Sequence, residues 1–168
     1  MAGKAGFSLI ELLIVVAIIL VIAAIAIPNL LRAKIAADES SAASSVRRIA
    51  TAQVAYNAAY PTVGYASQLS YLGGPSNGCA ASSTTACMID SVLASGTKSG
   101  YQLLTAGFSS SGGPNDSFVA SSAPSAFNET GVRNFCIVTD GVLRQQMGTS
   151  GGVPAPDVNT CTNYATAQ

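Results

Sequence analysis

The most prominent pattern in the chain is one long apolar segment near its N-terminus. Residues 7–27 contain a single charged side chain, Glu11, and a single hydroxyl side chain, Ser8. As an α-helix this segment would extend roughly 31 Å, close to the hydrocarbon thickness of a bilayer, which is about 30 Å. The pattern therefore predicts a helix that can span a membrane.

A second, amphipathic pattern follows Pro28. Apolar or weakly polar positions recur mainly at steps of three and four residues, the spacing of one helix face. They are Leu31, Ile35, Ala42, Val46, Ile49, Gln53, Tyr56 and Tyr60. Charged residues, including Glu39 and Arg47, occupy other faces. Because proline removes a helical hydrogen bond, we predict one long helix over residues 7–59 with a local break at Pro28.

The remainder of the chain shows short strand patterns separated by turn residues. Residues 60–98 form a connecting region with a strong turn signal at residues 73–75. Strand patterns occur at residues 100–105, 117–120, 134–139 and 142–144. Asp140-Gly141 separates the last two and predicts a two-residue hairpin turn with both residues at positive φ. The predicted fold is α+β, with the long helix packed on an antiparallel sheet of about four strands.

Composition and charge exclude several classes of function. The formal net charge is zero and no basic run exceeds Arg47-Arg48, so nucleic-acid binding is not indicated. Histidine is absent, which excludes a Ser-His-Asp triad and the usual zinc sites. We find no phosphate-binding loop and no paired catalytic carboxylates. The sequence predicts neither an enzyme nor a cofactor.

The four cysteines all follow the apolar segment. An even number in this position favours disulfides formed in an oxidising compartment, and four cysteines allow three connectivities. We prefer Cys79–Cys87, which would close a small surface ring, together with Cys136–Cys161. The second bond would enclose a Gly- and Pro-rich tail that otherwise frays, and loop closure of this length contributes about 3.5 kcal/mol.

Glu11 decides between three interpretations of the apolar segment. A plain anchor, oriented by Lys4 with its N-terminus inside, has no need for a carboxylate. A secretory signal cut at Ala24-Ile25-Ala26 has no need for a carboxylate either. In a spanning helix a carboxylate costs roughly 2.5–3.5 kcal/mol at the centre. Ser8 and Glu11 fit a capping box, but this does not account for Gly6-Phe7. The third interpretation is a segment that leaves the membrane to form a filament core.

Residues 4–19 and 23–28 resemble the leader and N-terminal helix of type IV pilins and of type II secretion pseudopilins. The resemblance implies a leader at residues 1–6, cleavage after Gly6 by a prepilin peptidase, and methylation of Phe7. It also implies a transmembrane and filament-core helix at residues 7–30 and a globular head at residues 31–168. The head would contain an amphipathic helix (31–59), a connecting loop (60–98), and a sheet with a C-terminal disulfide loop (99–168).

The expected function is that of a structural subunit of a type IV pilus supporting adhesion, motility or DNA uptake. Its partners would be copies of itself, the inner membrane, the prepilin peptidase and the pilus assembly platform. The precursor would cross the inner membrane once, N-in and C-out, before joining an extracellular filament. In that filament the Glu11 carboxylate would meet the Phe7 amine of a neighbouring subunit and fix the axial register.

Two alternatives stay open at this point. One is a pseudopilin of a type II secretion system, although the C-terminal placement of Cys136 and Cys161 resembles the pilin disulfide loop. The other is a membrane-anchored or secreted binding domain that does not polymerise. The small number of acids disfavours a calcium ion held by Asp140, Asp157 and nearby carbonyls, as in some pseudopilin heads. We predict no metal site.

Overall fold

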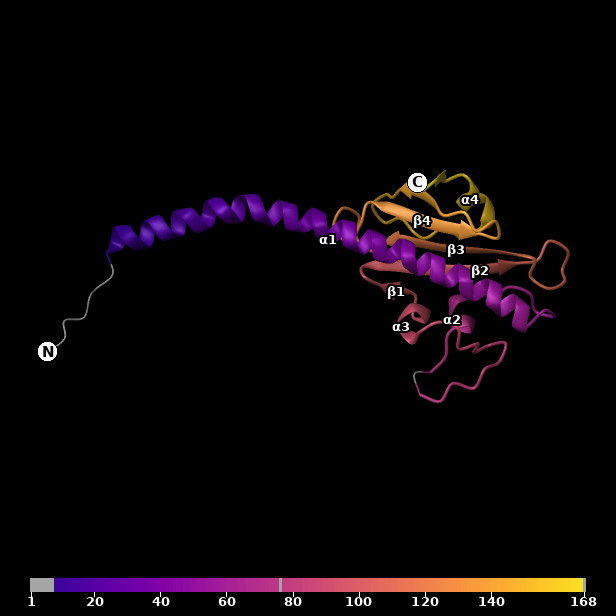
Figure 1. Cartoon of the computed structure of the whole chain (residues 1–168). Coiled ribbons are helices and arrows are strands. Elements are labelled where there is room, and N and C mark those ends of the chain that lie inside the picture. Colours follow the sequence, from indigo (N-terminus) through magenta and orange to yellow (C-terminus); the bar gives the residue numbers. More distant parts are fainter. Residues whose placement is uncertain (1–7, 76, 168) are drawn as a thin grey trace. The chain divides into compact units, whose positions relative to one another are not determined.

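The computed structural model describes residues 8–75 and 77–167 (Figure 1). The helices are α1 (Leu9–Ala59), α2 (Leu69–Leu72), α3 (Ser91–Ala94) and α4 (Val158–Thr162). The strands are β1 (Thr97–Lys98), β2 (Tyr101–Phe108), β3 (Ser117–Pro124), β4 (Arg133–Val138), β5 (Arg144–Met147) and β6 (Ala165–Thr166). The chain divides into two compact units between Lys34 and Ile35, and each is described by itself.

The first part of α1 makes up the described portion of the N-terminal unit. Ser8 precedes the helix, and its carbonyl accepts the amides of Glu11 (3.1 Å) and Leu12 (3.2 Å). Pro28 lies inside the element, so the predicted break at Pro28 is absent from the structure. Proline removes only one amide donor, and the turns on either side can keep their own hydrogen bonds. A single proline within a strongly helical sequence therefore need not end the helix.

The second part of α1 packs on the sheet of the head. Val46, Ile49 and Tyr56 are fully buried, as the predicted stripe requires. They share one core cluster with residues of three strands, among them Leu103, Phe118 and Phe135. Figure 1 shows this part of α1 lying across β2 and β3. The predicted α+β architecture, a long helix on an antiparallel sheet, is confirmed.

The sheet is a meander of six strands in the order β1-β2-β3-β4-β5-β6, and every neighbouring pair is antiparallel. We predicted about four strands. The additional strands, β1 and β6, have two residues each and lie at the two edges. Such short segments carry no alternating pattern of apolar and polar residues, which explains why the sequence did not reveal them.

The hairpin between β4 and β5 differs from the prediction. Of the two expected turn residues only Gly141 has a positive φ (73°), and its amide bonds to the Val138 carbonyl at 2.9 Å. Pairing resumes at Arg144 opposite Cys136, so the strand predicted at residues 142–144 is found at Arg144–Met147. The physical reason is the Asp140 carboxylate. It accepts the Val142 amide (2.9 Å) and pairs with Arg144, which holds a wider loop.

A two-residue turn with both residues at positive φ does occur elsewhere in the sheet. Ser99 (φ 49°) and Gly100 (φ 70°) connect β1 to β2, where Lys98 pairs with Tyr101. This is the turn geometry that suits the twist of antiparallel hairpins. The prediction therefore identified the right kind of turn but assigned it to the wrong hairpin.

The C-terminal segment covers the face of the sheet opposite α1. Val119, Cys136 and Val138 form a second core cluster with Ala155, Cys161 and Tyr164 from this segment. The Ser121 hydroxyl adds a hydrogen bond to the Ala155 carbonyl at 2.7 Å. The structure pairs Cys136 with Cys161 and Cys79 with Cys87, the connectivity that we prefer from the sequence. The Cys136–Cys161 bond joins β4 to α4.

A buried carboxylate attaches α1 to β4. Glu39, placed by the sequence pattern on a charged face, is only 4% exposed. Its Oε1 accepts the Val132 amide at 2.9 Å, and its Oε2 accepts Nε and Nη2 of Arg133 at 2.8 and 2.6 Å. Burial of the ring, together with the Glu39 carboxylate, raises the pKa of Tyr101 above its ordinary value. The helix therefore meets β4 through charge as well as through apolar packing.

Candidate functional site

The side chains of the first part of α1 form an apolar surface that the described residues do not cover. Leu9 is 81% exposed, and the leucine, isoleucine and valine side chains that follow as far as Leu31 are about half exposed or more. The most apolar 18-residue window has a mean hydropathy of 3.3, and none of it is buried. By length and composition α1 can cross a membrane. A surface this apolar needs either lipid or other protein chains around it.

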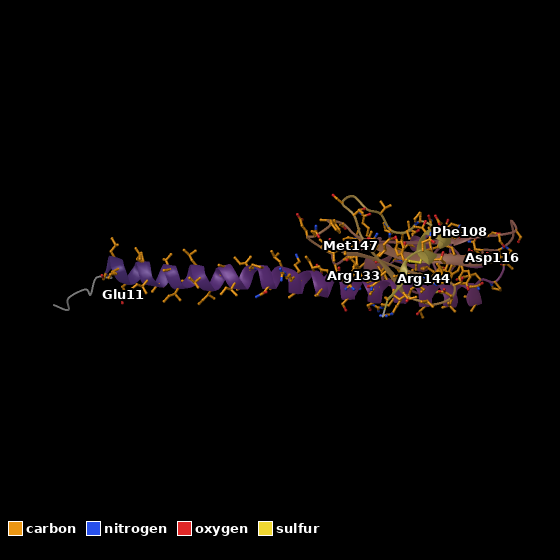
Figure 2. All side chains as sticks on the ribbon, turned by 90° about the horizontal axis from the view of Figure 1, so that it is seen from above. Glu11, Phe108, Asp116, Arg133, Arg144 and Met147 are labelled. Atoms are coloured by element: carbon orange, nitrogen blue, oxygen red, sulfur yellow. A yellow bond between two sulfur atoms is a disulfide. The ribbon has the colours of Figure 1, made fainter. Side chains whose placement is uncertain are left out.

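Glu11 is the one charged side chain within this apolar surface. It lies in the first turn of α1, where Figure 2 labels it near the start of the ribbon. A carboxylate at a helix N-terminus interacts favourably with the helix dipole. That interaction is small, however, compared with the cost of placing the charge in lipid or in a protein core without a cation. In either of these environments a positively charged partner would lower that cost.

No such partner is found in the described part of the chain. The two ion pairs there are Glu39–Arg133 and Asp140–Arg144, and neither includes Glu11. Two of the predicted site residues, Gly6 and Phe7, lie outside the described residues. Pro28 lies within α1, and the four cysteines belong to the head. The structure thus places Glu11 and Pro28 on one helix.

The carboxylates considered for calcium are already engaged. Asp140 pairs with Arg144, and hydrogen bonds from Arg144 hold the pKa of Asp140 below its usual value. Asp157 caps α4 by accepting the amide and the hydroxyl of Thr160 at 2.8 and 3.0 Å. Over residues 8–75 and 77–167, no three metal-ligating side chains come together. Calcium would have to compete with these interactions at both aspartates.

A buried glutamine side chain in the head is a further polar feature, and the apolar stripe of α1 does not explain it. Gln53 is fully buried. Its Nε2 donates to the Ala66 carbonyl at 2.9 Å, and its Oε1 accepts the backbone amide of Ala66 at 2.8 Å. Its Nε2 also donates to Thr105 Oγ1 at 2.8 Å. The one sequence signal for this buried hydrogen-bonding role was a glutamine at a position of the apolar stripe. Its role is to fix α1 to the connecting segment and to β2.

Comparison with known protein families identifies the N-terminal segment. Residues 1–27 match the family described as the prokaryotic N-terminal methylation motif. The chain carries a prepilin-type N-terminus. This is the motif shared by type IV pilins and pseudopilins, so the resemblance predicted from the sequence is confirmed. The chain has no match among curated proteins or among solved structures.

The motif and the geometry agree on the general class of the protein. A prepilin-type N-terminus marks pilin-like structural proteins, which are generally not enzymes. It implies processing by a prepilin peptidase and assembly into a pilus-like polymer. Together with the exposed apolar helix, it fits a precursor anchored in the inner membrane.

Proposed function

We propose that this chain is a structural subunit of a type IV pilus, assembled through its N-terminal helix after the leader is removed. The observation that carries the proposal is an apolar helix that the described residues leave uncovered, with a carboxylate in its first turn that none of them pairs, directly behind a prepilin-type cleavage motif. Before assembly, membrane lipid surrounds the apolar surface of the helix. In the filament, the same surface of neighbouring copies replaces the lipid.

The proposed assembly step depends on cleavage between Gly6 and Phe7. Cleavage creates an amine on Phe7, four residues before Glu11 in the sequence, and methylation leaves that amine positively charged. In the low-dielectric core of a filament, the Glu11 carboxylate of one subunit pairs with the Phe7 amine of its neighbour. Either charge alone would be heavily penalised there. The pair therefore favours one axial register over the others.

The proposed route begins in the inner membrane and ends outside the cell. Lys4 on the N-terminal side of the apolar helix favours an N-in, C-out orientation. The prepilin peptidase and the assembly platform act on the chain in the membrane. The head, which contains two disulfides, then forms the surface of an extracellular filament that supports adhesion, motility or DNA uptake. No catalytic activity is part of this proposal.

Pseudopilins share the same N-terminal motif, so a type II secretion pseudopilus is the second candidate. The C-terminal disulfide favours the pilin. The Cys136–Cys161 bond ties the Gly- and Pro-rich tail onto the sheet, and this placement resembles the disulfide loop of pilins. A non-polymerising anchored domain is the third candidate, but the Glu11 carboxylate has no evident use in it.

Electron microscopy with gold-labelled antibodies against the head distinguishes these candidates. We expect long labelled fibres outside cells that produce the protein, and none on cells from which its gene has been deleted. Labelled stubs confined to the periplasm would instead favour the pseudopilin. Label spread over the membrane without any fibre would overturn the filament proposal.

A further inference from the structure

The two disulfides of the head lie in opposite environments. Cys136 and Cys161 are both completely buried, within the core cluster between the sheet and the C-terminal segment. Cys79 and Cys87, in contrast, are both exposed. Thiol–disulfide exchange requires a thiolate to reach a sulfur atom of the bond, so its rate depends on access. The head therefore contains one accessible disulfide and one that is shielded.

The Cys79–Cys87 bond also lines a hollow in the surface. This hollow has a volume of about 330 Å³, and Gly74, Ile89 and Asp90 contribute to its wall together with the two cysteines. Its size falls within the range of small-molecule sites, roughly 300–1,000 Å³. A Cβ atom at residue 74 would collide with the Sγ atom of Cys79, so glycine is needed there. A small thiol can thus approach this bond without any opening of the fold.

The backbone around Cys87 is strained but separately anchored. Cys87 has a φ of 58°, a left-handed conformation that is unfavourable for residues other than glycine. Its amide bonds to the Gly73 carbonyl at 3.1 Å, and the Met88 amide bonds to the Leu72 carbonyl at 2.8 Å. These bonds hold the segment to the core whether or not the disulfide is closed. Opening the bond therefore frees the two sulfur atoms and leaves the core packed.

We propose that Cys79–Cys87 is a site of reversible reduction by small dithiols, whereas Cys136–Cys161 is a structural bond that resists them. A thiolate of the dithiol attacks one sulfur of the pair. The S–S bond breaks, the other cysteine leaves as a thiolate and takes up a proton, and a mixed disulfide forms. The second thiol of the reagent, once deprotonated, then attacks the reagent's own sulfur atom in the mixed disulfide and forms a cyclic disulfide. This releases the remaining cysteine, and two electrons pass from the dithiol to the protein. The proposal does not depend on the filament role.

Timed alkylation of the full chain in detergent micelles tests this directly. The protein is treated with dithiothreitol, quenched with iodoacetamide at intervals, digested, and analysed by mass spectrometry. We expect Cys79 and Cys87 to become alkylated at least about tenfold faster than Cys136 and Cys161, because only the first pair is accessible. The far-ultraviolet circular dichroism of the head should be unchanged when the first pair is fully reduced.

The same chain in concentrated urea serves as the control. Unfolding exposes all four cysteines equally, so the two pairs should then react at rates within about threefold of each other. A ratio below tenfold in the folded protein would overturn the proposal, as would faster reaction of Cys136 and Cys161. A tenfold ratio that persisted in urea would also overturn it, because the difference would then come from local sequence and not from the fold.

Discussion

Cells producing the Glu11→Ala variant are expected to form no filaments, although the variant's head folds normally. Glu11 lies in the apolar first part of α1, outside the compact unit that begins at Ile35, so the head does not need it. In the proposed filament core it supplies the only negative charge facing the Phe7 amine. At a separation of 4 Å and an effective dielectric constant of 20, such a pair is worth roughly 4 kcal/mol at each subunit contact.

The matched control is Asp38→Asn, which removes a carboxylate from the same helix within the head unit. We expect this variant to build filaments in normal numbers. Fibres are counted by electron microscopy, and the thermal unfolding of each purified variant is followed by circular dichroism. Glu11→Gln should behave as Glu11→Ala does, because the amide carries no charge. A folded Glu11→Ala protein that still builds normal filaments would refute the proposed role of Glu11.

Glu39→Ala is expected to lower the free energy of unfolding of the head by about 2–3 kcal/mol. The substitution removes the acceptor of the Val132 amide and of two Arg133 nitrogens, at a position where Glu39 itself is only 4% exposed. Leaving a buried donor unpaired costs about 1–3 kcal/mol, and bonds to charged groups lie toward the upper end of the range. The Arg133 side chain is 43% exposed and can regain water, which limits the loss.

Asp38→Ala provides the comparison for this measurement, since Asp38 is the neighbouring acid on the same helix and is only partly buried. We expect it to change the free energy of unfolding by less than about 0.5 kcal/mol, as is usual for surface substitutions. Urea titration followed by circular dichroism gives both values. Equal and small losses for the two variants would show that the Glu39–Arg133 contact contributes little.

The features that the sequence predicted well are those determined by nearby residues. The apolar run, and the apolar positions that recur every three or four residues after it, determine α1. Both are local signals, because helical hydrogen bonds join residues four apart. The motif around Gly6 and Glu11 is likewise contained in one short segment. These local signals were sufficient to predict the long helix, the α+β class and the prepilin-type N-terminus.

The features that the sequence did not reveal depend on residues far apart in the chain. Glu39 was placed on a charged face because its partners, Val132 and Arg133, are more than ninety residues away. Asp140 and Gly141 do not form the predicted two-residue turn, because the Asp140 side chain pairs with Arg144 and holds a wider loop. The sequence predicted the surface ring closed by Cys79–Cys87, but it did not reveal the complete burial of Cys136 and Cys161, which depends on tertiary packing.

The mature N-terminus tests the central claim of prepilin-type processing and assembly most directly. Intact-mass and N-terminal peptide analysis of the protein recovered from cells should show a chain that begins at Phe7 with a methylated amine. A chain that begins at Ile27 would identify a conventional secreted protein. An intact Met1 would identify a simple membrane anchor, and either result would contradict the filament account.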